Sequence, residues 1–154
     1  MKLSLPEFIQ NVISSFEAEK GIKKMWREPL LALLSAKHPF LPKLKDVVAI
    51  DHLLPDDILP GAKNIIVYFI PFETGIIESN MKGEAASEEW ALAYILTNEL
   101  LSFISDAIEK ELNQHGFRVG KQKPTHNFDE KNSHQPLVSP AYCLDGRARN
   151  LWHQ

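Results

Sequence analysis

Cysteine is almost absent from this chain. Cys143 is the single cysteine among 154 residues. An intrachain disulfide is therefore impossible, and a zinc or iron–sulfur site built from several thiolates of this chain is excluded. The sequence around Cys143 offers nothing that would activate its thiol, which argues against a nucleophilic role. We expect neither disulfide nor thiol chemistry from the chain itself.

An excess of charge of one sign and long apolar runs are also missing. The formal net charge is -3, so no basic surface for nucleic acid or for an anionic membrane is indicated. The first residues do not form a charged segment followed by an apolar leader, and no apolar run is long enough to cross a membrane. We therefore expect a cytoplasmic protein that does not insert into a membrane.

Sequence motifs of common catalytic and nucleotide-binding sites are absent as well. There is no GxGxxG, no GxSxG and no HExxH, and Gly61-Ala62-Lys63 lacks the spacing of a phosphate-binding loop. The residues alone therefore predict an α/β protein without a recognisable active site.

The strongest structural feature that is present is the apolar run from Ile65 to Ile70. It follows the turn at Pro60-Gly61 and consists of β-branched and aromatic residues, which predicts a strand covered on both faces. Pro71 cannot continue a central ladder and should end the strand. We predict an α/β (α+β) fold with a small sheet around residues 64–70 and flanking helices.

Two helices are well marked at their ends. Ser4 is a predicted N-cap, Glu7 is placed to complete a capping box, and the helix should end at Gly21. Ser87 is the predicted N-cap of the longest helix, which should run from Glu88 to about His115 with a wide apolar arc.

The other segments carry weaker patterns. We predict a short helix within Trp26 to Ala36, a loop over residues 73–87 and a short strand at residues 117–119, which completes a strand–helix–strand pattern. We treat residues 1–133 as a single α/β domain. Residues 134–154 are expected to form an irregular, disordered tail, because apolar periodicity is lost there.

Two groups of side chains near the predicted helices allow a functional and a structural interpretation. Lys20, Lys23 and Lys24 would suit either a phosphate site or a solvated helix end, and we favour the helix end because cations complement its dipole. Trp90 and Tyr94 would suit either a cofactor platform or the core, and we favour the core.

Histidines and one aspartate outside the helices also have two interpretations. His126, Asp129 and His134 are metal-ligand types, but three such residues within a short loop are common by chance, so we favour solvated roles and predict no metal site. His52 is expected to cap or pack in the loop before the strand.

One long segment resembles a known family. The stretch HLLPDDILPGAKNIIVYFIPF is similar to the N-terminal region of the epoxyqueuosine reductase-like iron–sulfur proteins, in which a loop of the type LLP-acidic-x-LPGAK precedes a strand. The pieces SNMKGEAASEEWALAYILTNELLSFISDAIEKELNQHGFR and THNFDE also fit, so the resemblance covers roughly Leu3 to Glu130. It implies a partial nitroreductase-like core followed by AGLGTFG and cysteine clusters for [4Fe-4S] centres. None of these later motifs occurs in the chain.

A shifted reading frame would explain the missing motif. Synonymous codons for residues 135–154 can be chosen so that, after the first base is dropped, they encode SHWSHRHIAWMAGLGTFGI, which contains the expected segment. Because a one-base shift leaves two letters of each new codon largely fixed by the observed residues, we hypothesise a frameshift between about Glu130 and Gln135. Under this hypothesis Cys143, Trp152 and His153 have no evolved role.

The resemblance implies a cobalamin-dependent reductase that receives electrons from two [4Fe-4S] clusters and reduces the epoxide of a modified tRNA base. Asp129 would be the general acid, and His126 and Asn127 would face the corrin or the substrate. The family has valine–aspartate–serine where this chain has Phe128-Asp129-Glu130. The resemblance also implies that [4Fe-4S] clusters belong only to a full-length form, and that cobalamin is the cofactor to consider for this chain.

Three hypotheses about function follow. The first is the N-terminal domain of such an oxidoreductase, inactive alone because the cluster-binding part is absent. The second is a non-catalytic domain that binds a corrinoid or a partner. The third is a protein that self-associates as a homo-oligomer through exposed apolar surface.

Overall fold

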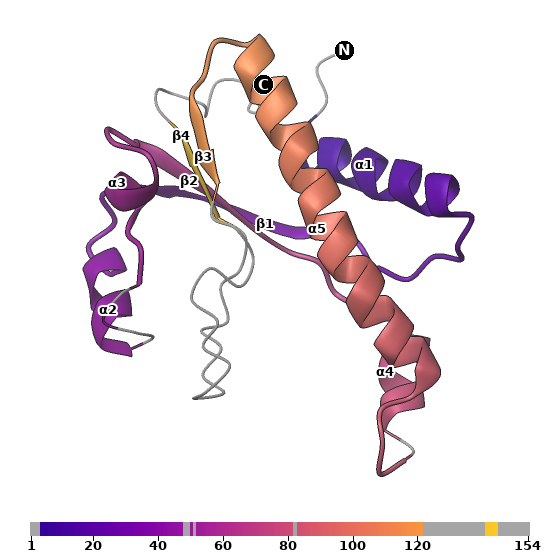
Figure 1. The fold of residues 1–154 in the computed structure, drawn as a ribbon. Helices are drawn as coiled ribbons and strands as arrows, with labels where there is room; N and C mark the ends of the chain where they lie inside the picture. The colour runs from indigo at the N-terminus through magenta and orange to yellow at the C-terminus, as the bar shows by residue number, and fades with distance from the viewer. Residues whose placement is uncertain (1–3, 48–49, 51, 82, 122–140, 145–154) are drawn as a thin grey trace. The chain divides into compact units, whose positions relative to one another are not determined.

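A computed structural model of the chain describes residues 4–47, 50, 52–81, 83–121 and 141–144. Figure 1 shows its helices and strands in chain order. They are α1 (Leu5–Lys20), β1 (Leu30–Ser35), the 3-10 turn η1 (Leu41–Lys43), α2 (Leu44–Val47), α3 (Pro55–Ile58), β2 (Asn64–Phe69), α4 (Thr74–Asn80), α5 (Glu88–Gln114), β3 (Val119–Lys121) and β4 (Ala141–Leu144).

The backbone groups into two compact units. The first unit comprises Met1–Leu30 and Phe69–Ile108, and the second comprises Leu31–Tyr68 and Glu109–Gln154. The mixture of helices and antiparallel strands is that of an α+β protein, as the sequence predicts at this coarse level. The nitroreductase-like core stays a prediction.

The start of α1 is fixed by the predicted capping box. The Glu7 amide donates to Ser4 Oγ at 3.4 Å, and the Ser4 amide donates to Glu7 Oε2 at 2.8 Å, so each residue satisfies the backbone of the other. The helix ends at Gly21, whose φ of 63° is the left-handed conformation that glycine adopts most readily. Both predicted ends are confirmed.

Helix α5 spans the range that the sequence predicts. Its buried side chains recur every three or four residues and form a single apolar stripe; they are Ala93, Leu96, Leu100, Ile104, Ile108 and Leu112. By length and composition alone α5 could also cross a membrane, but the core helix of a soluble protein passes the same test.

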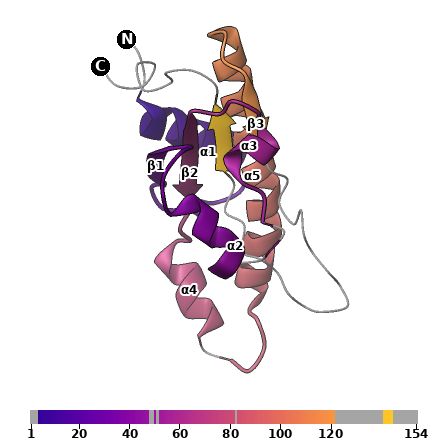
Figure 2. The same ribbon diagram turned by 90° about the vertical axis from the view of Figure 1, so that its left-hand side faces the viewer.

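The second unit contains a four-stranded sheet in the order β1-β2-β4-β3, which Figure 2 shows side by side. Strand β4 is antiparallel to both of its neighbours, so β2 and β3 run parallel with β4 between them. Ile65 and Ile66 of β2 are buried, and Pro71 lies beyond the strand end. The predicted central strand is therefore confirmed.

Two predicted elements are wrong. The segment Trp26 to Ala36 contains strand β1 instead of a helix, because its leucines satisfy the spacing of either element and pairing beside β2 decides the outcome. Helix α4 lies within residues 73–87, where a loop was predicted; the Ser79 hydroxyl donates to the Ile76 carbonyl oxygen at 2.8 Å within it.

The predicted strand at residues 117–119 is displaced toward the C-terminus, because β3 occupies Val119–Lys121. Within the predicted irregular tail, Ala141–Leu144 form β4. The other residues of that tail lie outside the described part of the structure, so the expected disorder stays a prediction.

Candidate functional site

The segment that carries the family resemblance, Leu53–Lys63, is here called the LPGAK connection. It forms the short helix α3 and then leads into β2. The Leu54 amide donates to the Asp57 carboxylate at 2.9 Å, and the Asp57 amide donates back to the Leu54 carbonyl oxygen at 2.9 Å. The Asp57 carboxylate therefore serves as the cap of α3.

The other aspartate of the connection, Asp56, stabilises the turn at Gly61. The Gly61 amide donates to Asp56 Oδ1 at 3.1 Å, and Gly61 has a φ of 82°, which favours glycine at this position. On either side of the turn, Leu59 and Ala62 are buried. The Pro60-Gly61-Ala62 part of the motif therefore forms a tight turn that packs on a small apolar core.

Strand β3 packs closely against this connection. Arg118 Nη2 donates to the Pro60 carbonyl oxygen at 3.4 Å. A Cβ added at Gly120 would lie 2.8 Å from Leu59 Cβ and 3.0 Å from Ile58 Cγ2. Only glycine permits this approach without displacing the connection.

The electrostatic environment of the connection indicates a structural role for its acidic side chains. Lys45 Nζ lies 4.0 Å from Asp57 Oδ2, and both side chains are partly exposed, so the pair adds little stability. Asp56 and Asp57 both accept hydrogen bonds from backbone amides. These contacts hold the connection in shape.

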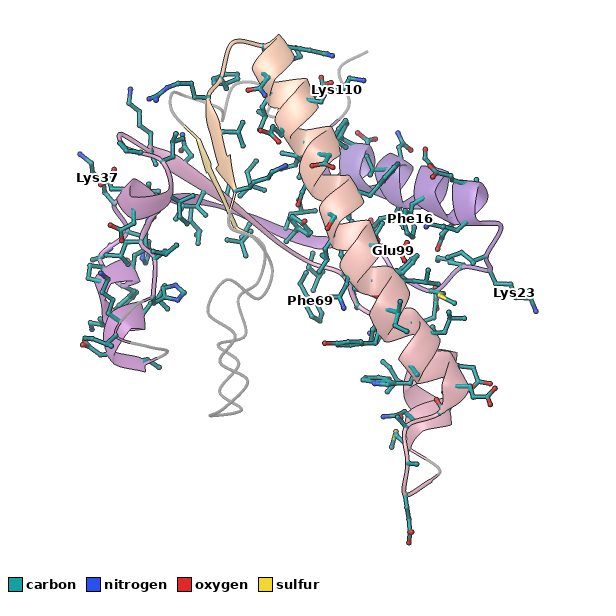
Figure 3. The ribbon with its side chains drawn as sticks, viewed as in Figure 1. Phe16, Lys23, Lys37, Phe69, Glu99 and Lys110 are labelled. Carbon is teal, nitrogen blue, oxygen red and sulfur yellow. The ribbon has the colours of Figure 1, made fainter. Side chains whose placement is uncertain are left out.

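The first unit contains a buried aromatic cluster between α1 and α5. Trp26 is fully buried and lies edge-to-face with Phe16 at 5.9 Å between ring centroids, and Phe16 lies 5.5 Å from Phe103. The Trp26 indole nitrogen donates to Thr97 Oγ1 at 2.8 Å. In Figure 3 the labelled Phe16 lies where α1 meets α5. The indole has its partner inside the protein, which indicates packing rather than a cofactor platform.

Two of the three lysines near the end of α1 form ion pairs. Lys20 Nζ lies 2.5 Å from Glu99 Oε2, and this hydrogen bond raises the pKa of Lys20. Lys24 Nζ lies 3.1 Å from Glu73 Oε1. Lys23, labelled in Figure 3, is exposed. Two of the three lysines thus have carboxylate partners in this structure, which is consistent with the favoured interpretation of a solvated helix end.

The two aromatic residues predicted to lie in the core differ from one another. Trp90 is half-buried and packs edge-to-face on Phe72 at 5.1 Å between centroids. Tyr94 is 55% exposed, so its prediction as a core residue is wrong. Tyr94 lies one turn further along α5 and on the same side of it as Trp90, beyond the buried stripe. His52 is half-buried before α3.

Several large apolar side chains are exposed. In the first unit they are Leu30, Phe69, Met81, Leu92, Tyr94 and Ile95, and in the second Leu34, Phe40, Val47 and Ile50. Phe69, at the end of β2, is 60% exposed. In Figure 3 its ring lies to the left of α5, whereas α1 lies to the right. Exposed apolar side chains mark an interaction surface where they form one contiguous patch, and these ten are divided between two units.

The predicted catalytic and binding residues lie outside the described residues. These are Asp129, His126 and Asn127, together with His134 of the alternative metal site. Within the residues that the structure does describe, no group of three or more His, Cys, Asp or Glu side chains is arranged to hold a metal ion. A [4Fe-4S] cluster needs four thiolates and the chain has one cysteine, so its residues do not fit that group.

Comparison with known proteins finds no matching family model, no matching curated protein and no matching solved structure.

Proposed function

We propose that this chain is the N-terminal α/β part of an epoxyqueuosine reductase-like iron–sulfur oxidoreductase, and that it is inactive on its own. The LPGAK connection is the observation that carries this proposal. Its two aspartates accept hydrogen bonds from backbone amides, and Gly61 allows the turn before β2. Residues used in this way suit a scaffold that supports an active site formed elsewhere. The chain's single cysteine cannot supply cluster ligands.

In this proposal the reaction is that of the family. Asp129 acts as the general acid, and His126 and Asn127 face the corrin or the substrate. Cobalamin would supply the reducing chemistry, and the tRNA substrate follows by analogy with the family. The [4Fe-4S] clusters would belong to a full-length form, so the chain alone carries no electron supply. We place the protein in the cytoplasm.

The coding DNA tests this proposal directly. We expect the bases that follow codon 130 to encode, in a shifted frame, an AGLG-type segment followed by clustered cysteines. Codons that cannot yield AGLG in either alternative frame would overturn the frameshift hypothesis. Anaerobic reconstitution of the purified chain with iron and sulfide provides a second test. We expect no cluster absorption. An assembled [4Fe-4S] cluster would contradict the proposal that the chain is inactive because it lacks cluster ligands.

A second candidate function is that of a non-catalytic domain that binds a corrinoid or a partner and self-associates. The exposed apolar side chains favour it, because surface of this kind drives association. Anaerobic purification with cobalamin tests corrinoid binding through a corrin absorbance that elutes with the protein. Light scattering at high protein concentration tests self-association, and a monomer at every concentration would exclude it.

A further inference from the structure

The first turns of α5 are apolar on more than the side that packs in the core. Residues 90–97, WALAYILT, contain no charged side chain over two helical turns. Only 28% of the most apolar 18-residue window of α5 is buried, whereas the core helix of a soluble protein is mostly buried. In Figure 1 these first turns extend beyond α1. This part of α5 therefore carries apolar surface that the described residues leave exposed.

Two exposed apolar side chains lie on one line along the outer side of α5. Leu92 is 48% exposed and Ile95 is 57% exposed, and Ala91 beside them is exposed as well. Residues three or four positions apart lie on the same side of a helix, so these three form a single patch, here called the outer face of α5. The buried stripe that begins at Ala93 lies on the other side of the helix. An apolar helix face of this pattern is one against which a second helix packs.

The charged residues in line with the outer face are glutamates. Glu88 lies one turn before the face and Glu99 lies one turn after it, and both are exposed. Glu89 is exposed next to Glu88, whereas the charge of Glu99 is compensated by its ion pair with Lys20. Residues 74–98 together contain four glutamates and a single lysine. The outer face is therefore set in a part of the chain with an excess of negative charge.

We propose that the outer face of α5 is a docking site for a cationic amphipathic helix of a partner protein. Apolar residues of that helix would pack on Leu92 and Ile95, and its lysines or arginines would lie against Glu88 and Glu89. The sign of the charge decides between classes of partner, because acidic surface repels nucleic acid and anionic membranes and attracts a cationic segment.

The same charges disfavour a second copy of this chain on the outer face. Suppose that two copies pack antiparallel, with Leu92 of each copy against Ile95 of the other. Glu88 of each copy then lies against Glu99 of the other, because both pairs of positions are centred on the same point of α5. Like charges would meet at both ends of such an interface. Self-association of the chain should therefore use other surface.

This inference rests on the second candidate function, the binding of a partner, and adds the chemistry of that partner. A single helix face supplies less surface than a standard interface, which buries about 800 Å² per partner, so binding should be weak, in the micromolar range. The contribution of the glutamates should fall as salt is added, because exposed charges are screened.

A synthetic helix tests the proposal on the unmodified chain. The probe is a fluorescein-labelled peptide of leucine and lysine, about eighteen residues long, with its leucines at helical spacing so that one side is apolar. We expect fluorescence anisotropy to show saturable binding that weakens with added salt. The matched peptide has glutamate at every lysine position and should not bind. Vesicles of phosphatidylcholine and phosphatidylserine should not bind the chain either.

Variants of the chain locate the site. Leu92→Gln/Ile95→Gln should raise the Kd of the lysine peptide by at least about tenfold, because two apolar contacts are lost. Val47→Gln/Ile50→Gln removes two exposed apolar side chains of the second unit, so it is the matched control and should leave the Kd unchanged. Glu88→Gln/Glu89→Gln should raise the Kd about threefold at low salt and reduce its salt dependence. If Leu92→Gln/Ile95→Gln loses helix content by circular dichroism, the glutamate variant decides the question.

Several results would overturn the proposal. The outer face is not a site for a cationic helix if the lysine peptide does not bind, if the glutamate peptide binds equally well, or if the control variant weakens binding as much as Leu92→Gln/Ile95→Gln does. Binding to the anionic vesicles, or a dimer in light scattering that Leu92→Gln/Ile95→Gln dissociates, would assign the face to a different occupant. A chain that binds cobalamin or self-associates but does not bind the peptide would keep the second candidate function and lose only this inference.

Discussion

The hydrogen bond between Trp26 and Thr97 allows a quantitative test of the first unit. Trp26 is fully buried, and its indole nitrogen donates to Thr97 Oγ1 at 2.8 Å. The Thr97 hydroxyl in turn donates to the Ala93 carbonyl oxygen at 2.6 Å, which leaves its lone pairs directed to the indole. Changing either partner of this hydrogen bond should lower the free energy of unfolding.

The magnitude follows from two effects. Trp26→Phe removes the hydrogen bond, worth about 1 kcal/mol, and leaves unfilled space that costs about 2 kcal/mol more. Thr97→Val keeps the shape of the side chain but buries the indole N–H without an acceptor, at about 1–3 kcal/mol. The double variant should be less destabilised than the sum of the two changes by about 1–2 kcal/mol, because the hydrogen bond is lost only once.

Urea unfolding followed by circular dichroism measures these free energies for the unmodified chain and the three variants. The matched control is Trp90→Phe combined with Thr97→Val. Trp90 lies on α5, the helix that also carries Thr97, but its half-buried ring packs on Phe72. The effects of Trp90→Phe and Thr97→Val should therefore add within about 0.5 kcal/mol. If the destabilisations caused by Trp26→Phe and Thr97→Val simply add in the double variant, the hydrogen-bond argument is refuted.

Two further predictions concern the packing of β3 and the cap of α1. Gly120→Ala should destabilise the protein by about 1–3 kcal/mol in urea unfolding, because the new Cβ would lie 2.8 Å from Leu59 Cβ. Gly75→Ala, with nothing within 4 Å of the new Cβ, is the control and should be neutral or stabilising. The Ser4 hydroxyl lowers the pKa of Glu7, so the stability from this carboxylate is present above its unfolded pKa and is lost as pH falls through the folded value. Glu7→Gln should therefore be less stable than the unmodified chain near neutral pH, and the difference should vanish in acid; a difference that persists there would contradict the pKa argument.

The elements that the sequence predicts well are those specified by residues close together in the chain. Ser4, Glu7 and Gly21 mark the ends of α1 through capping contacts within a few residues, and the range Glu88–Gln114 is long enough for its helical period to be clear. The apolar run that forms β2 is equally local. In each case the sequence pattern favours one type of element clearly over the other.

The elements that the sequence does not predict depend on pairing with distant residues. The leucines of β1 occupy positions that suit either a helix or a strand, and its place beside β2 is settled by contacts about thirty residues away in the chain. Strand β4 lies between β2 and β3, although its own four residues show no recognisable period. Pro29 and Pro39, which limit β1 to a short span, were the available indication of a strand.

The candidate site was predictable only as a family motif. LLPDDILPGAK could be recognised as a sequence, but its letters do not show that Asp57 caps α3 or that Asp56 holds the turn at Gly61. Those roles depend on backbone geometry. The exposure of Tyr94 likewise depends on how wide an arc of α5 is covered, which a helical period alone does not determine.

The two proposed functions make opposing demands on the exposed apolar side chains of the first unit. If this chain is part of a larger oxidoreductase, residues encoded in the shifted frame should cover side chains such as Phe69, and a frame-restored protein should stay monomeric. If self-association is its function, those residues should remain available in any longer form. A frame-restored protein that binds iron–sulfur clusters and stays monomeric in light scattering would favour the oxidoreductase. A frame-restored protein that still self-associates would show that this association belongs to the complete enzyme itself.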